Sequence, residues 1–197
     1  MFFKQIAAVG LGLALSVSVA QADTWTLDGA ASNLAFGSIK FNDTGEVHSF
    51  GSVDGTVAED GTVTLGIDLS SVETNIDIRN ERMIEHVFKN APRAAISAQI
   101  DMTALDAMPV GDSTVMEVEG TLELLGTEIP LYGDMFVMRL TEDKVMVTTD
   151  SMMFLSTADA GIEAGVDKLM ELASLPNIVR TVPVTLRLMF DADGTSG

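Results

Sequence analysis

The sequence contains no cysteine among its 197 residues. This absence excludes disulfides, thiolate nucleophiles and metal sites with sulfur ligands. Disulfides are needed mainly by exported domains that are too small to bury a sufficient core. A chain of this length buries enough apolar surface to fold without them.

Aromatic and basic residues are also scarce. Aromatics make up 6% of the chain, with one Trp and one Tyr, too few for the two interfacial girdles of an outer-membrane barrel. Eleven Lys and Arg stand against 29 Asp and Glu, giving a net charge of -18. Such an acidic chain repels phosphate backbones and anionic membrane surfaces. We therefore expect no nucleic-acid partner and no stable membrane insertion.

One long apolar run, from Ile6 to Val19, lies near the N-terminus. It follows Lys4 and precedes Ala20-Gln21-Ala22, the order of charge, apolar core and small residues that is typical of a secretory signal peptide. The run is shorter than the roughly 20 residues that cross a bilayer, which disfavours a membrane anchor. The sequence predicts an exported protein with a signal peptide at residues 1–22, cleaved after Ala22, and one domain at 23–197. Loss of Lys4 leaves that domain with a net charge of -19.

Alternation of apolar and polar residues dominates the rest of the chain. In residues 62–69, for example, every second residue is a Val, Leu or Ile, and Asp60-Gly61 just before them is a strong hairpin signal. Strands linked by short turns favour an antiparallel barrel or sandwich. We expect about eight strands, near 24–28, 33–41, 46–58, 61–72, 93–103, 113–125, 127–140 with 144–150, and 180–191. If 127–140 and 144–150 are separate strands, the number is nine.

Two segments have helical spacing instead. Residues 77–88 carry apolar side chains at helical intervals before Pro92, and residues 161–175 carry an apolar stripe that ends at Pro176. A one-sided stripe favours a helix that covers a core or closes the mouth of a barrel. A partner-binding or membrane-surface helix is the alternative, and the net acidity disfavours the membrane version.

Catalytic patterns are sparse. The two histidines, His48 and His86, lie far apart in the sequence and in no zinc-binding motif. A metal site that the fold assembles from His and carboxylates stays open as an alternative. His48 precedes Ser49, but neighbours on a strand point to opposite faces and make a poor base and nucleophile pair. The chain has no nucleophile elbow, phosphate loop or dinucleotide fingerprint. We expect no enzyme, no catalytic residue, no metal site and no required cofactor.

Methionine is unusually frequent, with twelve residues. Methionine fills irregular space and adapts to variable apolar shapes. The side chains either fill a core or line a cavity for a flexible apolar ligand, and a small antiparallel barrel can enclose one such ligand.

Three stretches resemble a known family. Residues 68–83 read DLSSVETNIDIRNERM, residues 25–36 read WTLDGAASNLAF, and residues 118–127 read VEGTLELLGT. In this order they resemble the YceI-like family of exported, lipocalin-like proteins that bind polyisoprenoids. The resemblance spans essentially the whole predicted domain.

The resemblance implies an all-β fold, an eight-stranded antiparallel lipocalin-like barrel. Together with the two helical segments, the expected architecture has a short helix after strand 4 and a longer helix before the last strand. It also implies a periplasmic protein that sequesters or carries an isoprenoid small-molecule ligand, of the ubiquinone-like or polyprenyl phosphate type, in an apolar channel. The candidate ligand-binding residues are Phe36, Thr74, Arg79, Asn80, Met83 and Phe88. Arg79 is placed to contact a head group, unless Arg79 and Arg82 merely pair with acids of their own short helix.

Two features depart from the family pattern. A helix is expected near 160–175, at a point where the chain of many relatives continues almost directly into the last strands. This helix could cover, shorten or fill the cavity. The histidine that relatives often carry after the second strand's Phe-x-Val/Ile is missing from Phe36-Gly37-Ser38-Ile39-Lys40-Phe41. A ligand-free stress or interaction module, or an enzyme acting on a small apolar substrate, are the alternative functions, and a homodimer is left open.

Overall fold

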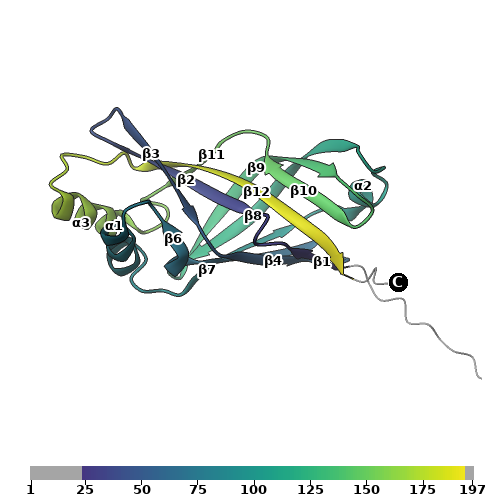
Figure 1. Ribbon diagram of the computed structural model, residues 1–197, viewed down its shortest axis with the longest axis horizontal. Coiled ribbons are helices and arrows are strands. Elements are labelled where there is room, and N and C mark those ends of the chain that lie inside the picture. The colour runs from purple at the N-terminus through teal and green to yellow at the C-terminus, as the bar shows by residue number, and fades with distance from the viewer. Residues whose placement is uncertain (1–23, 194–197) are drawn as a thin grey trace, which may run out of the picture.

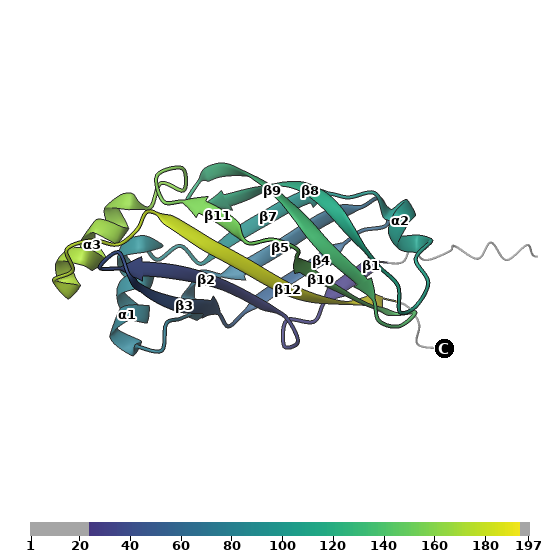
Figure 2. The same ribbon diagram turned by 90° about the horizontal axis from the view of Figure 1, so that it is seen from above.

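The computed structural model describes residues 24–193, and the predicted signal peptide and its cleavage site lie outside them. The described chain forms an elongated antiparallel barrel with most of its helical residues at one end (Figures 1 and 2). The strands are β1 (Thr24–Leu27), β2 (Asn33–Lys40), β3 (Thr44–Phe50), β4 (Val53–Val57), β5 (Thr62–Asp68), β6 (Val72–Glu73), β7 (Arg93–Gln99), β8 (Ser113–Leu124), β9 (Thr127–Arg139), β10 (Lys144–Thr149), β11 (Met153–Ser156) and β12 (Thr181–Asp193). The helices are η1 (Leu69–Ser71), α1 (Asp77–Arg82), η2 (Met83–Val87), α2 (Met102–Asp106) and α3 (Glu163–Ala173).

The long strand β12 closes the barrel. One of its edges pairs with β1 and β2, and the other pairs with β10 and β11. The short strands β1 and β2 therefore share one position in the ring, as do β3 and β4 beside them. Within residues 24–193 this arrangement gives eight strand positions around a closed barrel, which confirms the predicted fold class.

The expected strands are distributed differently among these positions. The runs near 127–140 and 144–150 are two neighbouring strands, β9 and β10, whereas the first two expected strands lie along one edge of β12. The expected strand at 93–103 ends at Gln99, because Asp101 accepts a hydrogen bond from the Thr103 amide and begins helix α2. Strand β11 was not anticipated from the sequence.

Both expected helical segments are present. Residues 77–82 form α1, which continues directly into the wider turns of η2 at residues 83–87, and α3 lies just before β12. Helix α3 packs closely on η2 because residue 165 is glycine: a Cβ there would lie 2.5 Å from the His86 carbonyl oxygen. Among residues 24–193, no helix combines the length and apolar character required to cross a bilayer.

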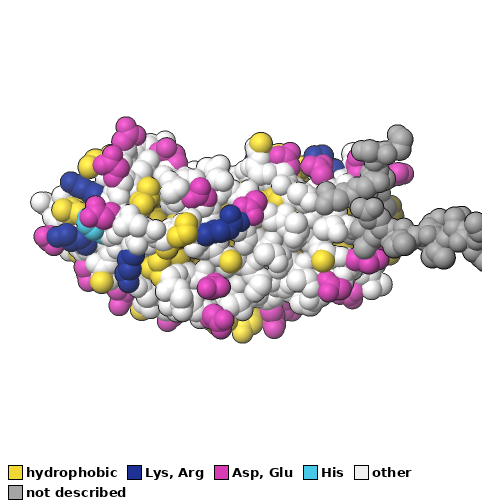
Figure 3. Space-filling view, turned by 90° about the horizontal axis from the view of Figure 1, so that it is seen from below, with side chains coloured by type: hydrophobic (Ala, Val, Ile, Leu, Met, Phe, Trp, Pro, Cys, Tyr) yellow, Lys and Arg dark blue, Asp and Glu magenta, His cyan; other side chains and the backbone are white. Residues whose placement is uncertain are grey.

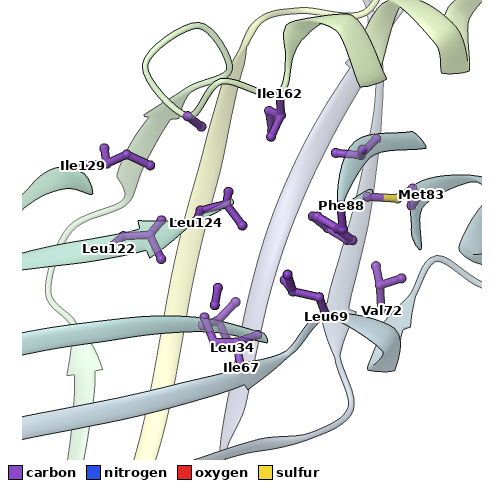
Figure 4. Close-up of a cluster of buried hydrophobic side chains, with 13 residues drawn as sticks. Leu34, Ile67, Leu69, Val72, Met83, Phe88, Leu122, Leu124, Ile129 and Ile162 are labelled. Carbon is purple, nitrogen blue, oxygen red and sulfur yellow. The ribbon is translucent and has the colours of Figure 1, made fainter. Parts of the chain in front are cut away.

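The alternating side chains meet inside the barrel in two clusters. Figure 4 shows the cluster at the helical end, where side chains from β2, β5, β8 and β9 meet those from η2 and the segment before α3. The other cluster surrounds Trp25 and Phe190 at the opposite end. Between and beside these clusters the barrel is hollow, and this hollow is the candidate site.

Candidate functional site

The barrel encloses a cavity of about 660 Å³. Its wall consists mainly of Leu, Ile, Val, Met and Phe side chains from the inward faces of the strands. It extends from Trp25 at one end to Val166 and Leu169 of α3 at the other. Cavities of roughly 300–1,000 Å³ with apolar walls are typical of small-molecule sites.

Aromatic rings form one side of the cavity near its helical end. The β2–β3 register sets Phe36 opposite His48 and Leu34 opposite Phe50. The ring centroids of Phe36 lie 5.2 Å from His48 and 5.4 Å from Phe50, and Phe50 lies 5.9 Å from Phe88. Such tilted contacts are favourable, so these rings pack against one another along this side of the cavity.

A polar cluster lies beside this aromatic wall. Ser38 and His48 share a hydrogen bond of 2.9 Å between Oγ and Nε2. The Glu46 carboxylate accepts hydrogen bonds from Lys40 at 2.9 Å and from Arg79 at 2.7 Å. All five side chains line the cavity, and they give an otherwise apolar wall one polar region.

Burial and the charges of this cluster favour the neutral form of His48. His48 is 4% exposed, and burial together with repulsion from Arg79 and Lys40 holds the pKa of His48 below its ordinary value, against an opposing contribution from Glu46. Burial alone would raise the pKa of Glu46, but hydrogen bonding from Lys40 and the charge of Arg79 lower it overall. The cluster therefore has two cations and one anion at neutral pH.

Three buried polar atoms on the cavity wall lack a hydrogen-bond partner among the described residues: His48 Nδ1, Arg79 Nε and Thr157 Oγ1. Buried polar groups are normally satisfied, since an unpaired one loses its hydration without compensation. The Arg79 Nε–H is a donor, so an oxygen acceptor of a bound molecule would satisfy it. The wall is thus prepared for a ligand that is mostly apolar and carries at least one polar end.

Four of the predicted ligand-binding residues, Phe36, Arg79, Met83 and Phe88, line the cavity. Thr74 and Asn80 are instead bonded to each other: the Asn80 side-chain oxygen accepts from the Thr74 amide at 2.8 Å and from its hydroxyl at 2.5 Å. This link fixes the turn that leads into α1, and Arg79 also donates to the Thr74 carbonyl at 2.5 Å. Thr74 and Asn80 are not among the residues that line the cavity, and direct ligand contact by these two residues stays a prediction.

The arginines of α1 bond to groups outside their own helix. Arg79 pairs with Glu46 on β3, and Arg82 donates to the Leu172 carbonyl of α3 at 3.5 Å. Helix α3 itself contributes Val166 and Leu169 to the wall at the helical end and leaves the interior hollow.

Sequence reasoning missed Ser38, Lys40, Glu46 and His48 as wall residues. It compared His48 with the adjacent Ser49, whereas the hairpin register brings Ser38 to it from the neighbouring strand. The sequence signal for this pairing was the alternation of apolar and polar residues in the two strands on either side of the turn near residues 42–45. Among residues 24–193, no cluster of three or more His, Asp or Glu side chains is arranged to hold a metal ion.

A closed eight-stranded barrel with an apolar interior and a polar region on its wall defines a lipocalin-like ligand-binding protein. The family model of the YceI-like domain matches residues 25–190, and the chain belongs to the YceI-like family.

Solved structures agree with this assignment. A polyisoprenoid-binding domain from Saccharophagus degradans, implicated in plant cell wall breakdown, is 36% identical and superposes with a TM-score of 0.83, covering 85% of this chain and 98% of that domain. Burkholderia cenocepacia BcnA, at 13% identity, shares the fold with a TM-score of 0.61 over 83% of this chain and 98% of its own. A search of the curated proteins finds no match.

Proposed function

We propose that this protein binds a polyisoprenoid lipid in the barrel cavity and carries or sequesters it in the periplasm. The observation that carries the proposal is the combination of a cavity of about 660 Å³ with apolar walls and one polar region beside Arg79 and His48. The 36% identity to a polyisoprenoid-binding domain supports the same ligand class. Export through the predicted signal peptide would place the protein where an apolar molecule has to cross water.

The apolar wall supplies affinity relative to water. Burial is worth about 0.8 kcal/mol per CH₂, so each five-carbon unit that enters the cavity contributes several kcal/mol. A bilayer offers a lipid tail an equally apolar environment, so the same burial gives little advantage over a membrane. The polar region and the shape of the cavity must therefore decide which lipid the protein removes from a membrane.

We propose that the head group of the ligand lies at the polar region. Both a ubiquinone-like ring and a polyprenyl phosphate present oxygen acceptors to the Arg79 Nε–H and the neutral His48. Because Glu46 already pairs with Lys40 and Arg79, the cluster retains one net positive charge for an anionic head group. Competition between a quinone and a polyprenyl phosphate with tails of equal length measures how much that charge contributes to binding of the head group.

Mass spectrometry of an organic extract tests the proposal directly. Protein purified from its native host should release a prenyl lipid at a substantial fraction of the protein concentration. Protein stripped of lipid should then bind an added isoprenoid quinone or polyprenyl phosphate. A clean native extract, together with no binding of either added lipid, would contradict the proposed function.

The Ser38–His48 hydrogen bond favours a second candidate, hydrolysis of a lipid ester. In a catalytic pair the histidine is oriented by a third group, but His48 Nδ1 has no hydrogen-bond partner among the described residues. We therefore assign the pair to binding. Replacement Ser38→Ala should change ligand affinity, and loss of a prenyl-ester hydrolase activity in this variant would support the enzyme instead.

A further inference from the structure

Three large apolar side chains are exposed where the cavity reaches the surface. Phe41, Ile76 and Ile78 are 48%, 46% and 51% exposed, and all three also line the cavity. They form the rim of its opening. Exposed apolar groups that are continuous with an apolar cavity mark a surface that is covered when the protein functions.

The rim is assembled from separate segments at the helical end. Phe41 follows β2 in the β2–β3 hairpin, Ile76 and Ile78 lie at the start of α1, and the nearby hairpin, α1 and α3 all project at this end of the barrel (Figure 2). Leu175, just after α3, lines the same cavity.

The backbone at the rim supports a role for these side chains. Phe41 has a φ of 57°, a left-handed conformation that is unfavourable for a bulky residue. The same conformation occurs at Asn75, directly before Ile76, and at Ser174, directly before Leu175. Unfavourable backbone conformations that persist at a binding surface are a reason to look for function there.

Charge distinguishes this end from the rest of the molecule. Of the ten Lys and Arg in residues 24–193, six lie on or beside the β2–β3 hairpin, α1, η2 and α3: Lys40, Arg79, Arg82, Lys89, Lys168 and Arg180. On the face drawn in Figure 3, basic side chains gather mainly toward this end, whereas acidic side chains occur along its whole length. Eight Asp and Glu lie on the same elements, so this end is not positively charged, but the other described residues carry twenty acids against four bases. The helical end is therefore the part of an acidic protein that is least repelled by phosphate head groups.

We infer that the rim formed by Phe41, Ile76 and Ile78 docks on the surface of a lipid bilayer. The inference rests on the proposed function, since docking would let an isoprenoid lipid pass between bilayer and cavity without exposing its tail to water. A lipid surface fits the rim better than a second copy of the chain, because two copies of a protein with a net charge of -18 repel each other. Contact is peripheral, with only the rim entering the boundary between head groups and acyl chains.

Transfer of ubiquinone-10 between phosphatidylcholine vesicles tests this inference. The wild-type transfer rate should rise with vesicle concentration, because collision with a bilayer is part of the reaction. Ile78→Asp should slow transfer by about tenfold or more, and Ile76→Asp should act in the same direction. Asp is favourable at the N-cap and in the first turn of a helix, so both variants should fold.

Val115→Asp is the matched control. Val115 is 51% exposed, like Ile78, but lies on β8 and does not line the cavity. This variant should transfer lipid at the wild-type rate. Anionic lipid in the vesicles should slow wild-type transfer, and added salt should restore it, because the protein as a whole is acidic.

Equilibrium binding of ubiquinone-10 delivered from detergent separates the two hypotheses. Ile78 also lines the cavity, so the transfer rate is compared with the affinity of the same variant. A transfer rate that falls at least tenfold more than the affinity in Ile78→Asp supports docking. Transfer that falls only in proportion to the affinity, that is equally fast in all variants, or that is independent of vesicle concentration overturns it. A dimer in size-exclusion chromatography that Ile78→Asp dissociates would assign the rim to a second copy and also overturn the inference. Loss of binding in the wild type would refute the proposed function itself.

Discussion

Arg79 on helix α1 donates a hydrogen bond to Glu46 on strand β3 across 2.7 Å. The same guanidinium donates to the Thr74 carbonyl, so one side chain ties α1 to the barrel wall and to its own leading turn. Both members of the ion pair are less than a third exposed. The same ion pair therefore stabilises the helical end and forms part of the polar region of the cavity.

Replacement of Arg79 by Met should lower the free energy of unfolding by about 1–3 kcal/mol, because hydrogen bonds to charged groups contribute this much when they are partly buried. Urea denaturation measures the change. Lys168→Met removes an exposed pair with Glu171 and is the control, with little change expected. Equal losses in the two variants would show that the Arg79–Glu46 link has no special role.

Replacement of Ala98 by Phe should shorten the cavity. Ala98 points inward from β7, whereas its neighbour Ala95 on the same strand is not part of the cavity wall. We expect Ala98→Phe to weaken binding of a ten-unit isoprenoid at least tenfold compared with a short-tailed analogue, since each excluded CH₂ forfeits about 0.8 kcal/mol. Ala95→Phe is the control. Isothermal titration with both ligands would contradict the cavity assignment if the two variants behaved alike.

Replacement of His48 by Gln should reduce the loss of stability in mild acid. The pKa of His48 is lowered in the fold from an unfolded value of 6.5, so below that pH the unfolded chain takes up a proton that the folded protein does not. Wild-type stability should therefore fall relative to the variant between about pH 7 and pH 5. Glu46, whose pKa is lowered from 4.5, contributes a separate loss at lower pH.

Urea denaturation across this pH range, with wild type and His48→Gln side by side, checks the expectation. As the pH falls, the unfolding free energy of the wild type should decrease more than that of His48→Gln. A difference that stays constant from pH 8 to pH 5 would mean that His48 titrates equally in both states.

Replacement of Gly165 by Ala should destabilise the helical end. Ala normally stabilises a helix relative to Gly by about 1 kcal/mol. Here the new Cβ would lie 2.5 Å from the His86 carbonyl oxygen and 2.6 Å from the Val87 Cα, and backbone atoms cannot move aside easily. We expect a net loss of about 1–3 kcal/mol and faster hydrogen exchange in α3.

Gly45→Ala is the control for this substitution. No heavy atom lies within 4 Å of a Cβ added there, so thermal unfolding should change little. Gain of stability in Gly165→Ala would show that α3 does not pack on η2 as closely as the structure has it.

The strand and helix content of the chain was accessible from sequence because its signals are local. Alternation in residues 62–69 predicts β5 with one buried face, and the helical spacing in residues 77–88 predicts α1 with η2. The family resemblance then supplied closure into an eight-stranded barrel. The expected strand at 93–103 shows the limit of such signals. Asp101 lies inside it, caps helix α2 and so ends the strand early.

The candidate site was only partly predictable. Arg79 and Phe36 were expected in it and line the cavity, whereas His48 was considered only with the residue beside it. Its partner Ser38 lies ten residues away and is brought to it by the hairpin register. Thr74 and Asn80 were expected as ligand contacts, and the structure bonds them to each other.

By itself the sequence determined an acidic, cysteine-free chain whose period-two segments each need an apolar interior to cover one face. The tertiary structure decided how β12 divides its edges between four shorter strands, and thereby which inward faces meet around the cavity. It also decided that Glu46, His48 and Arg79 form one cluster on an apolar wall. The physical reason is that side-chain periodicity depends on neighbouring residues, whereas strand pairing and barrel closure depend on contacts between residues far apart in the chain.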